Sequence, residues 1–190
     1  MRIFWFRDGL ARFASEKYKL KGWQNPFIHL TNYAINKDNA NYQADTNADA
    51  STGHKRSLNS IYIRLAREGV DVEDLKAKMR DMIVKTLISI QPDLVHHYRT
   101  SQPSDIYNNM CFEILGFDVL IDNKGAPWLL EVNHAPSFNC DTALDASVKK
   151  NLVQDTFRLL NVTVAEKHHI INVIKQIHEQ RVIGINKTNK

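Results

Sequence analysis

Cysteine, glycine and proline are scarce in this 190-residue sequence. It has two cysteines, Cys111 and Cys140, seven glycines and five prolines. Two cysteines without close, even spacing exclude a disulfide-stapled secreted domain and favour a reducing compartment. So few glycines and prolines exclude collagen-like repeats and low-complexity linkers. With 43% hydrophobic residues, the chain has enough apolar side chains for a packed domain of mixed helices and strands.

Long apolar runs and an export signal are also absent. No apolar segment approaches the roughly 20 residues that a membrane helix needs. The first residues, MRIFWFRDG, carry charge too early for a signal peptide. We therefore expect a soluble, cytoplasmic protein without membrane contact.

Neither sign of charge is in strong excess. The 25 Lys and Arg residues against 21 Asp and Glu give a net charge of +4. This balance favours anionic partners such as nucleotides, acidic peptides or nucleic acid, without choosing among them. Nucleic-acid binding has no other support and ranks last. Walker, G-x-G-x-x-G and G-x-S-x-G motifs are missing, and His96, His97 and Cys111 lack the spacing of zinc ligands.

Helical periodicity is clear in the middle of the chain. Ser57 can cap a first helix that ends at Gly69. Asp71 can cap a second, whose apolar stripe is expected to stop at Pro92. The apolar stripes of both helices predict core packing.

Two more helices are predicted towards the C-terminus. One is expected from a cap at Asp141 to about Leu160, and a more basic one over residues 164–183. The polar segment 35–54 predicts a long loop, which is typical of substrate loops or disorder.

Strand patterns are predicted near the N-terminus. The runs 3–6 and 10–14 flank Arg7-Asp8-Gly9 and predict a hairpin, and 27–33 predicts a further strand. The polar cluster His29 to Tyr33 at the end of that strand fits either a ligand contact or a locally capped turn.

The stretch 112–138 is the most informative. The runs 114–121 and 126–133 flank Asp122-Asn123-Lys124-Gly125, which predicts a hairpin because Asn and Gly accept a positive φ. A two-residue loop at Asn123-Lys124 would set Asp118 opposite Leu129.

Side-chain alternation then separates two faces of this hairpin. Asp118, Glu131 and Asn133 share one face. The other is predicted to pack and comprises Phe117, Val119, Ile121, Trp128, Leu130 and Val132. A register slip of one residue would separate Asp118 from Glu131.

Two carboxylates and an amide oxygen on adjacent strands are hard ligands of the kind that Mg²⁺ prefers. We therefore predict a site for a metal and a nucleotide at Asp118, Glu131 and Asn133. A solvated polar face of an edge hairpin is the ordinary alternative. A glycosidase-like acid/base pair fits less well, because an amide oxygen suits metal coordination better than proton transfer.

Several motifs in order resemble the tubulin-tyrosine-ligase-like family. They cover most of residues 2–160: DGLARFA, HLTNYAINK, KTLIS, CFEILGFDVLID and PWLLEVNHAPSFNCDTALD. The continuation from His134 is most similar to the polyglutamylases.

The resemblance implies an α/β (α+β) fold of the ATP-grasp type, mainly an antiparallel sheet with packed helices and incomplete at the N-terminus. Residues 1–163 would form the C-terminal part of that domain, and residues 164–190 a basic helix and tail. The implied activity uses ATP and Mg²⁺ to activate a carboxylate as an acyl phosphate, which an amino group attacks. Polyglutamylases add free L-glutamate to acidic tubulin tails.

The resemblance also implies residue roles, but it leaves the catalytic residues unassigned. Asp118, Glu131 and Asn133 resemble the metal ligands, and Thr31 and Asn32 resemble nucleotide contacts. The positions that resemble substrate contacts are Arg12, Tyr33, Ala34, Lys55 and His134.

A truncated, non-catalytic tubulin-binding module or pseudoenzyme is the alternative to an active ligase. In either case we expect a monomer that binds tubulin and no nucleic acid. The family implies a place in the cytoplasm on the cytoskeleton, including the cilium or basal body.

Overall fold

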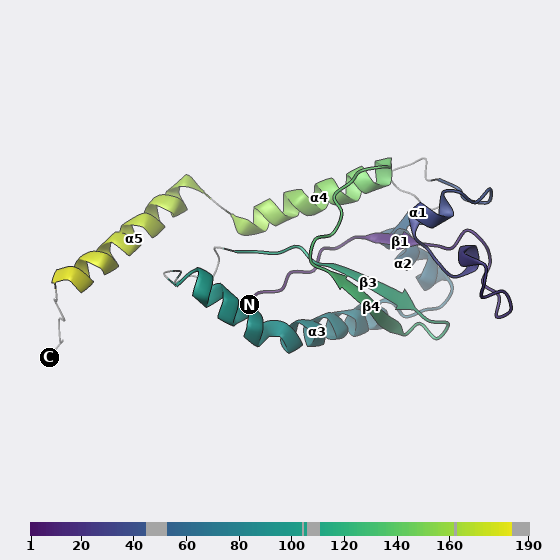
Figure 1. Cartoon of the computed structure of the whole chain (residues 1–190), viewed down its shortest axis with the longest axis horizontal. Helices are drawn as coiled ribbons and strands as arrows, with labels where there is room; N and C mark the ends of the chain where they lie inside the picture. Colours follow the sequence, from purple (N-terminus) through teal and green to yellow (C-terminus); the bar gives the residue numbers. More distant parts are fainter. Residues whose placement is uncertain (45–52, 104, 106–110, 162, 184–190) are drawn as a thin grey trace.

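The computed structural model describes residues 1–44, 53–103, 105, 111–161 and 163–183. Over these ranges the chain is a mixed α+β protein with small antiparallel sheets, which confirms the predicted fold class at this level (Figure 1). The strands are β1 (Leu10–Arg12), β2 (Lys55–Ser57), β3 (Gly116–Ile121) and β4 (Pro127–Asn133). The helices are η1 (Pro26–Ile28), α1 (Tyr33–Asn36), α2 (Leu58–Arg67), α3 (Val72–Ser101), α4 (Ala143–Leu160) and α5 (Val164–Ile183).

The predicted N-terminal hairpin is wrong. Residues 3–6 form no strand, and β1 pairs instead with β2, with Arg12 directly opposite Lys55. The distant strand prevails because β2 leads straight into α2, whose N-terminal Leu58 N–H donates to the carbonyl of Gly9 at 2.9 Å. This contact fixes β1 beside the start of α2.

The predicted strand over 27–33 is also wrong, because the segment forms η1 and then α1. Pro26 occupies the first turn of η1, and the Asn25 side chain accepts a hydrogen bond from the Phe27 N–H. The fully buried Asn36 accepts from Ser15 N–H and donates to the carbonyls of Leu30 and Asn32. This local capping replaces sheet pairing. Of the predicted loop 35–54, residues 45–52 lie outside the described ranges.

The caps predicted for the two central helices are confirmed. Ser57 accepts from Ser60 N–H at the start of α2, and Asp71 accepts from two N–H groups at the start of α3. The predicted stop at Pro92 is wrong, because α3 continues to Ser101. Pro92 removes one backbone donor, and the carbonyl it would have bonded belongs to Ile88, which is 61% exposed and within reach of water.

The last two helices follow the prediction closely. The helix α4 ends at Leu160, and α5 occupies the predicted range 164–183. The cap of α4 is Thr142 rather than Asp141, because the Thr142 hydroxyl accepts from Asp145 N–H at 3.1 Å. In Figure 1, α5 extends away from the rest of the chain beyond α4.

The β3–β4 hairpin forms where predicted, but with a different register. Asp122 pairs with Ala126 across a three-residue loop that ends in Gly125, whose φ is +74°. Continued unchanged, this register would place Asp118 opposite Leu130. A bulge between Asp118 and Val119 shifts the pairing by one residue, so Asp118 lies opposite Glu131 and not Leu129 as predicted.

Part of the predicted apolar face is therefore wrong. Val119 and Ile121 pack against the buried cluster of Tyr62, Leu75 and Met79, as expected for that face. Trp128 and Leu130 do not join them and are 59% and 63% exposed. The three-residue loop places Trp128 opposite Leu120, whereas the predicted loop would have placed it opposite Val119. Leu130 is the extra residue of the bulge and has no partner on β3.

Candidate functional site

The structure brings Asp118, Glu131 and Asn133 to one face of the β3–β4 hairpin. Asp118 and Glu131 are direct cross-strand partners, so their side chains stand on the same side of the sheet. Asn133 is two residues beyond Glu131, and its amide nitrogen donates to Glu131 Oε1 at 3.2 Å. The three-residue loop and the bulge each shift the pairing by one residue in the same direction, and the combined shift of two residues keeps the predicted grouping on one face.

Arg12 joins this face from another sheet. Its Nη2 lies 2.9 Å from Asp118 Oδ2, with the two side chains 39% and 34% exposed. A cation here counters the repulsion between two carboxylates that face each other across a ladder. Arg12, singled out as a substrate contact, thus touches a residue singled out as a metal ligand.

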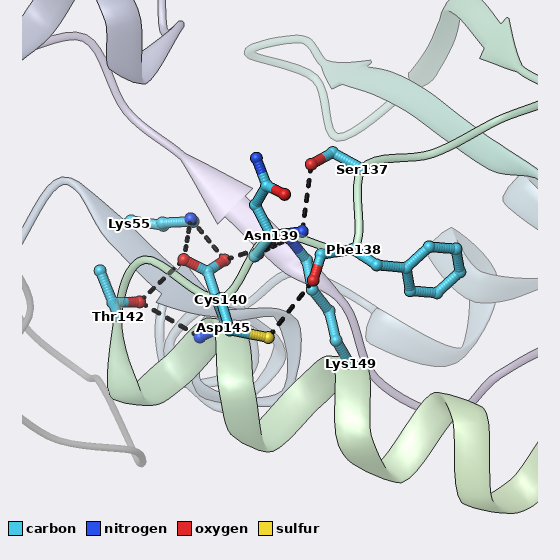
Figure 2. Close-up of polar contacts among 8 residues, drawn as sticks. All are labelled: Lys55, Ser137, Phe138, Asn139, Cys140, Thr142, Asp145 and Lys149. Atoms are coloured by element: carbon cyan, nitrogen blue, oxygen red, sulfur yellow. Dashed lines mark hydrogen bonds and ion pairs between the residues drawn. The ribbon is translucent and has the colours of Figure 1, made fainter.

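Lys55 is placed beside Arg12 and pairs with a different carboxylate. The two residues are direct partners in the β1–β2 ladder. The Lys55 ammonium lies 2.5 Å and 2.6 Å from the two carboxylate oxygens of Asp145, at the start of α4 (Figure 2). The Oδ1 contact is an ion pair without hydrogen-bond geometry, which explains why that buried oxygen lacks a hydrogen-bond partner.

The cluster from Thr31 to Ala34 lies between η1 and the end of α1. Asn32 begins α1, but its side chain makes no capping hydrogen bond. Tyr33 is 47% exposed, and its ring lies 5.8 Å from that of Tyr42. In the described part of the chain, no hydrogen bond or ion pair links 31–34 to the β3–β4 hairpin. His134, which follows β4, is exposed.

Asp122 shapes the loop of the same hairpin. Its carboxylate accepts hydrogen bonds from Lys124 N–H and Ala126 N–H at 2.8 Å each, and from the Trp128 indole at 3.0 Å. These donors, the Trp128 indole first, lower the pKa of Asp122 below its usual value. The role of Asp122 is structural, because these donors belong to its own hairpin.

Two buried polar residues were missed in the sequence. Asn36 organises the segment that carries Thr31 to Ala34, and Asp145 holds Lys55. The spacing Thr142-x-x-Asp145 is a helix-start signal that could have drawn attention to Asp145. Asn36 has no comparable local signal, because two of its partners are backbone carbonyls, which any residue carries, and the third, Ser15, is 21 residues away.

The donor set on the hairpin fits a hard divalent cation. It offers carboxylate oxygens from Asp118 and Glu131 and an amide oxygen from Asn133. Within the described ranges, no three His, Cys, Asp or Glu side chains gather as a metal site, so a metal at the hairpin would need the Asn133 amide oxygen as its third protein ligand.

The profile of the tubulin-tyrosine ligase family matches residues 1–171. The chain belongs to this family. The resemblance carried by the sequence motifs is thereby confirmed.

In the described ranges, each helix is too short or too polar to cross a bilayer.

Tubulin-modifying enzymes are among the similar proteins. A "probable beta-tubulin polyglutamylase" of Tetrahymena thermophila is 47% identical over 187 residues. The mouse tubulin polyglutamylase TTLL6 is 42% identical over 179 residues, and the mouse tubulin monoglutamylase TTLL4 is 36% identical over 176. These matches cover 96%, 93% and 90% of this chain, but 16%, 21% and 14% of the relatives. The chain thus spans about a fifth or less of their length.

Proposed function

We propose that this chain carries the metal-binding part of an ATP-dependent tubulin polyglutamylase. The reaction joins the amino group of free L-glutamate to a side-chain carboxylate of a glutamate in an acidic tubulin tail. That carboxylate would first take the γ-phosphoryl group of ATP, with release of ADP, and the amino group would then displace phosphate from the acyl phosphate to form the amide. Residues 1–163 would belong to an ATP-grasp-like domain and 164–190 to a separate basic segment.

The observation that carries this proposal is the direct pairing of Asp118 with Glu131, with Asn133 on the same face. Paired carboxylates on a ladder repel each other, so a sheet that holds them together gains from a bound cation. Asp118, Glu131 and Asn133 would hold Mg²⁺, which neutralises nucleotide phosphates when bound.

The cations near this face suit the proposed substrate. Free glutamate carries two carboxylates, and the planar guanidinium of Arg12 can donate two parallel hydrogen bonds to one of them. Asp118 takes one of its N–H donors in this structure, and 39% of the Arg12 side chain is exposed. We assign Arg12 and Lys55, with Tyr33, Ala34 and His134, to substrate binding.

Thr31 and Asn32 are proposed to contact the nucleotide. Both carry polar side chains at the start of a short helix, and the Asn32 side chain makes no capping hydrogen bond to the backbone of that helix. Its amide is thus available to a ribose or phosphate oxygen.

The test is incorporation of radiolabelled glutamate into microtubules by the purified chain with ATP and Mg²⁺. Glu131→Gln is expected to lower incorporation by about 100-fold or more, because the amide lacks the negative charge that a metal ligand supplies. Glu113→Gln is the matched control, since Glu113 is an exposed carboxylate just before β3. It is expected to retain activity within about threefold.

Two outcomes would contradict the proposal. Equal incorporation by the wild-type chain and Glu131→Gln would remove the metal role of the hairpin. Microtubule binding without incorporation would instead support a non-catalytic tubulin-binding module.

A further inference from the structure

A buried carboxylate that the proposed chemistry does not use lies at the start of α4. The Asp145 side chain is 1% exposed. Lys55 from β2 contacts both of its oxygens, and the Thr142 hydroxyl donates to Oδ2 at 3.0 Å. Lys149, one turn along α4, lies 3.9 Å from Oδ1. Figure 2 shows these groups around Asp145, with the Lys55 ammonium beside the Asp145 carboxylate.

The ion pair between Lys55 and Asp145 is expected to contribute little net stability to the fold. Removing two charges from water costs about as much as their attraction returns, so an apolar pair could hold α4 against β2 equally well. An apolar pair could not, however, fix an ammonium group at a defined place. The feature specific to Asp145 is therefore the position it gives to Lys55.

That position matters because Lys55 stands directly opposite Arg12 on the β1–β2 ladder. Like charges opposite one another on a ladder repel. Each cation has its own carboxylate from a different element, Asp145 of α4 for Lys55 and Asp118 of β3 for Arg12. These two carboxylates allow two cations to stand side by side.

We propose that Asp145 is a positioning residue, which holds Lys55 beside Arg12 so that the two cations receive a carboxylate of the free amino-acid substrate. That the substrate is glutamate rests on the proposed function. An ammonium has three N–H donors and a guanidinium five, so donors remain after Asp145 and Asp118 are satisfied. Asp145 itself is too buried to touch the substrate.

The first experiment measures KM and kcat for glutamate in Asp145→Asn, prepared in the full chain. We expect KM to rise about tenfold with kcat changed by less than about threefold, because Lys55 loses the charge-assisted contact that fixes it. A KM equal to or below that of the wild-type chain overturns the proposal.

Lys149→Met is the matched control. It removes a cation from the same carboxylate, but Lys149 has no place in the β1–β2 ladder and its contact is the longer one. Its KM is expected to stay within about twofold of the wild-type value. A rise as large as that of Asp145→Asn would mean that the network acts through α4 as a whole and would overturn the specific role of Lys55.

Asp145→Asn also leaves Lys55 without a counter-charge in a buried place, which can prevent folding. Thr142→Val is the second variant, because it removes the hydroxyl donor to Asp145 and leaves both charges in place. A smaller rise in KM, about threefold, is expected. An unchanged KM in a folded Thr142→Val chain counts against the proposal.

A measurement without substrate separates this proposal from the proposed function. Acetic anhydride labelling, read by mass spectrometry, reports how freely each lysine reacts. Lys55 is expected to be labelled about tenfold faster in Asp145→Asn, relative to the exposed Lys124. Unchanged labelling overturns the positioning role. Failure of the wild-type chain to incorporate glutamate overturns the proposed function, and the labelling then decides on the position of Lys55 independently.

Discussion

At the scale of single residues, Asp122 shows how one carboxylate sets a loop. Its three hydrogen-bond donors all come from the following six residues, so these contacts are local and do not depend on tertiary packing. Gly125 completes the loop at a positive φ, where another residue would be strained. The two residues together determine that the loop has three residues rather than two.

The acid sensitivity of this loop is the first prediction. Because folding lowers the pKa of Asp122 below its usual 3.8, the ionised carboxylate stabilises the folded chain above that pH. The contribution is lost as the pH falls through the lowered pKa. Urea unfolding is measured at pH 6, 4, 3 and 2. At pH 6 the wild-type chain is expected to have a larger free energy of unfolding than Asp122→Asn, and this difference is expected to narrow as the pH falls. A gap of the same size at every pH would contradict this account.

At the scale of elements, helix starts are specified by side chains next to them. Ser57, Asp71 and Thr142 each accept a hydrogen bond from a backbone N–H in the first turn of their helix. Asp141 has the right chemistry for a cap but is one residue too early. Thr142 takes the role because its hydroxyl bonds both the N–H and the carboxylate of Asp145.

The second prediction compares these two neighbours. Thr142→Ala is expected to lower the free energy of unfolding by about 1–2 kcal/mol, because the cap of α4 is lost. Asp141→Ala is expected to change it by less than about 0.5 kcal/mol, since Asp141 is exposed. Chemical denaturation followed by circular dichroism measures both. Equal losses in the two variants would show that Thr142 is not the cap.

At the scale of the whole molecule, the chain exposes more surface than a compact domain of its mass. It exposes 14569 Å², whereas a compact monomer of 21.9 kDa exposes about 9,300 Å² by general scaling. Large hydrophobic side chains of the hairpin, Leu120, Trp128 and Leu130 among them, are more than half exposed. The extended placement of α5 in Figure 1 contributes to the same result.

The third prediction follows from that surface. The chain is expected to bind the dye ANS more strongly than a compact protein of its size, because contiguous apolar side chains are open to solvent. X-ray scattering is expected to give a radius of gyration well above the roughly 16 Å of a compact 190-residue domain. A radius near that value, with weak dye binding, would show that α5 and the hairpin fold back.

Much of the structure could be predicted from local signals. The helices α2, α3, α4 and α5 follow from apolar periodicity and caps, because both depend on neighbours within a few residues. The hairpin follows from its turn for the same reason. The shared face of Asp118, Glu131 and Asn133 was predicted correctly because alternation along a strand has a period of two, and the loop and the bulge together shift the register by an even number.

The tertiary structure alone determined the strand pairing and the ion pairs between residues that are far apart in the sequence. β1 pairs with β2 some 43 residues away, Lys55 meets Asp145 across 90 residues, and Arg12 meets Asp118 across 106. Periodicity and local motifs do not predict such long-range pairs, because the packing of the elements determines which residues come into contact. The residue types and their alternation thus defined the polar face of the hairpin, while packing determined which cations surround it and which carboxylates hold them.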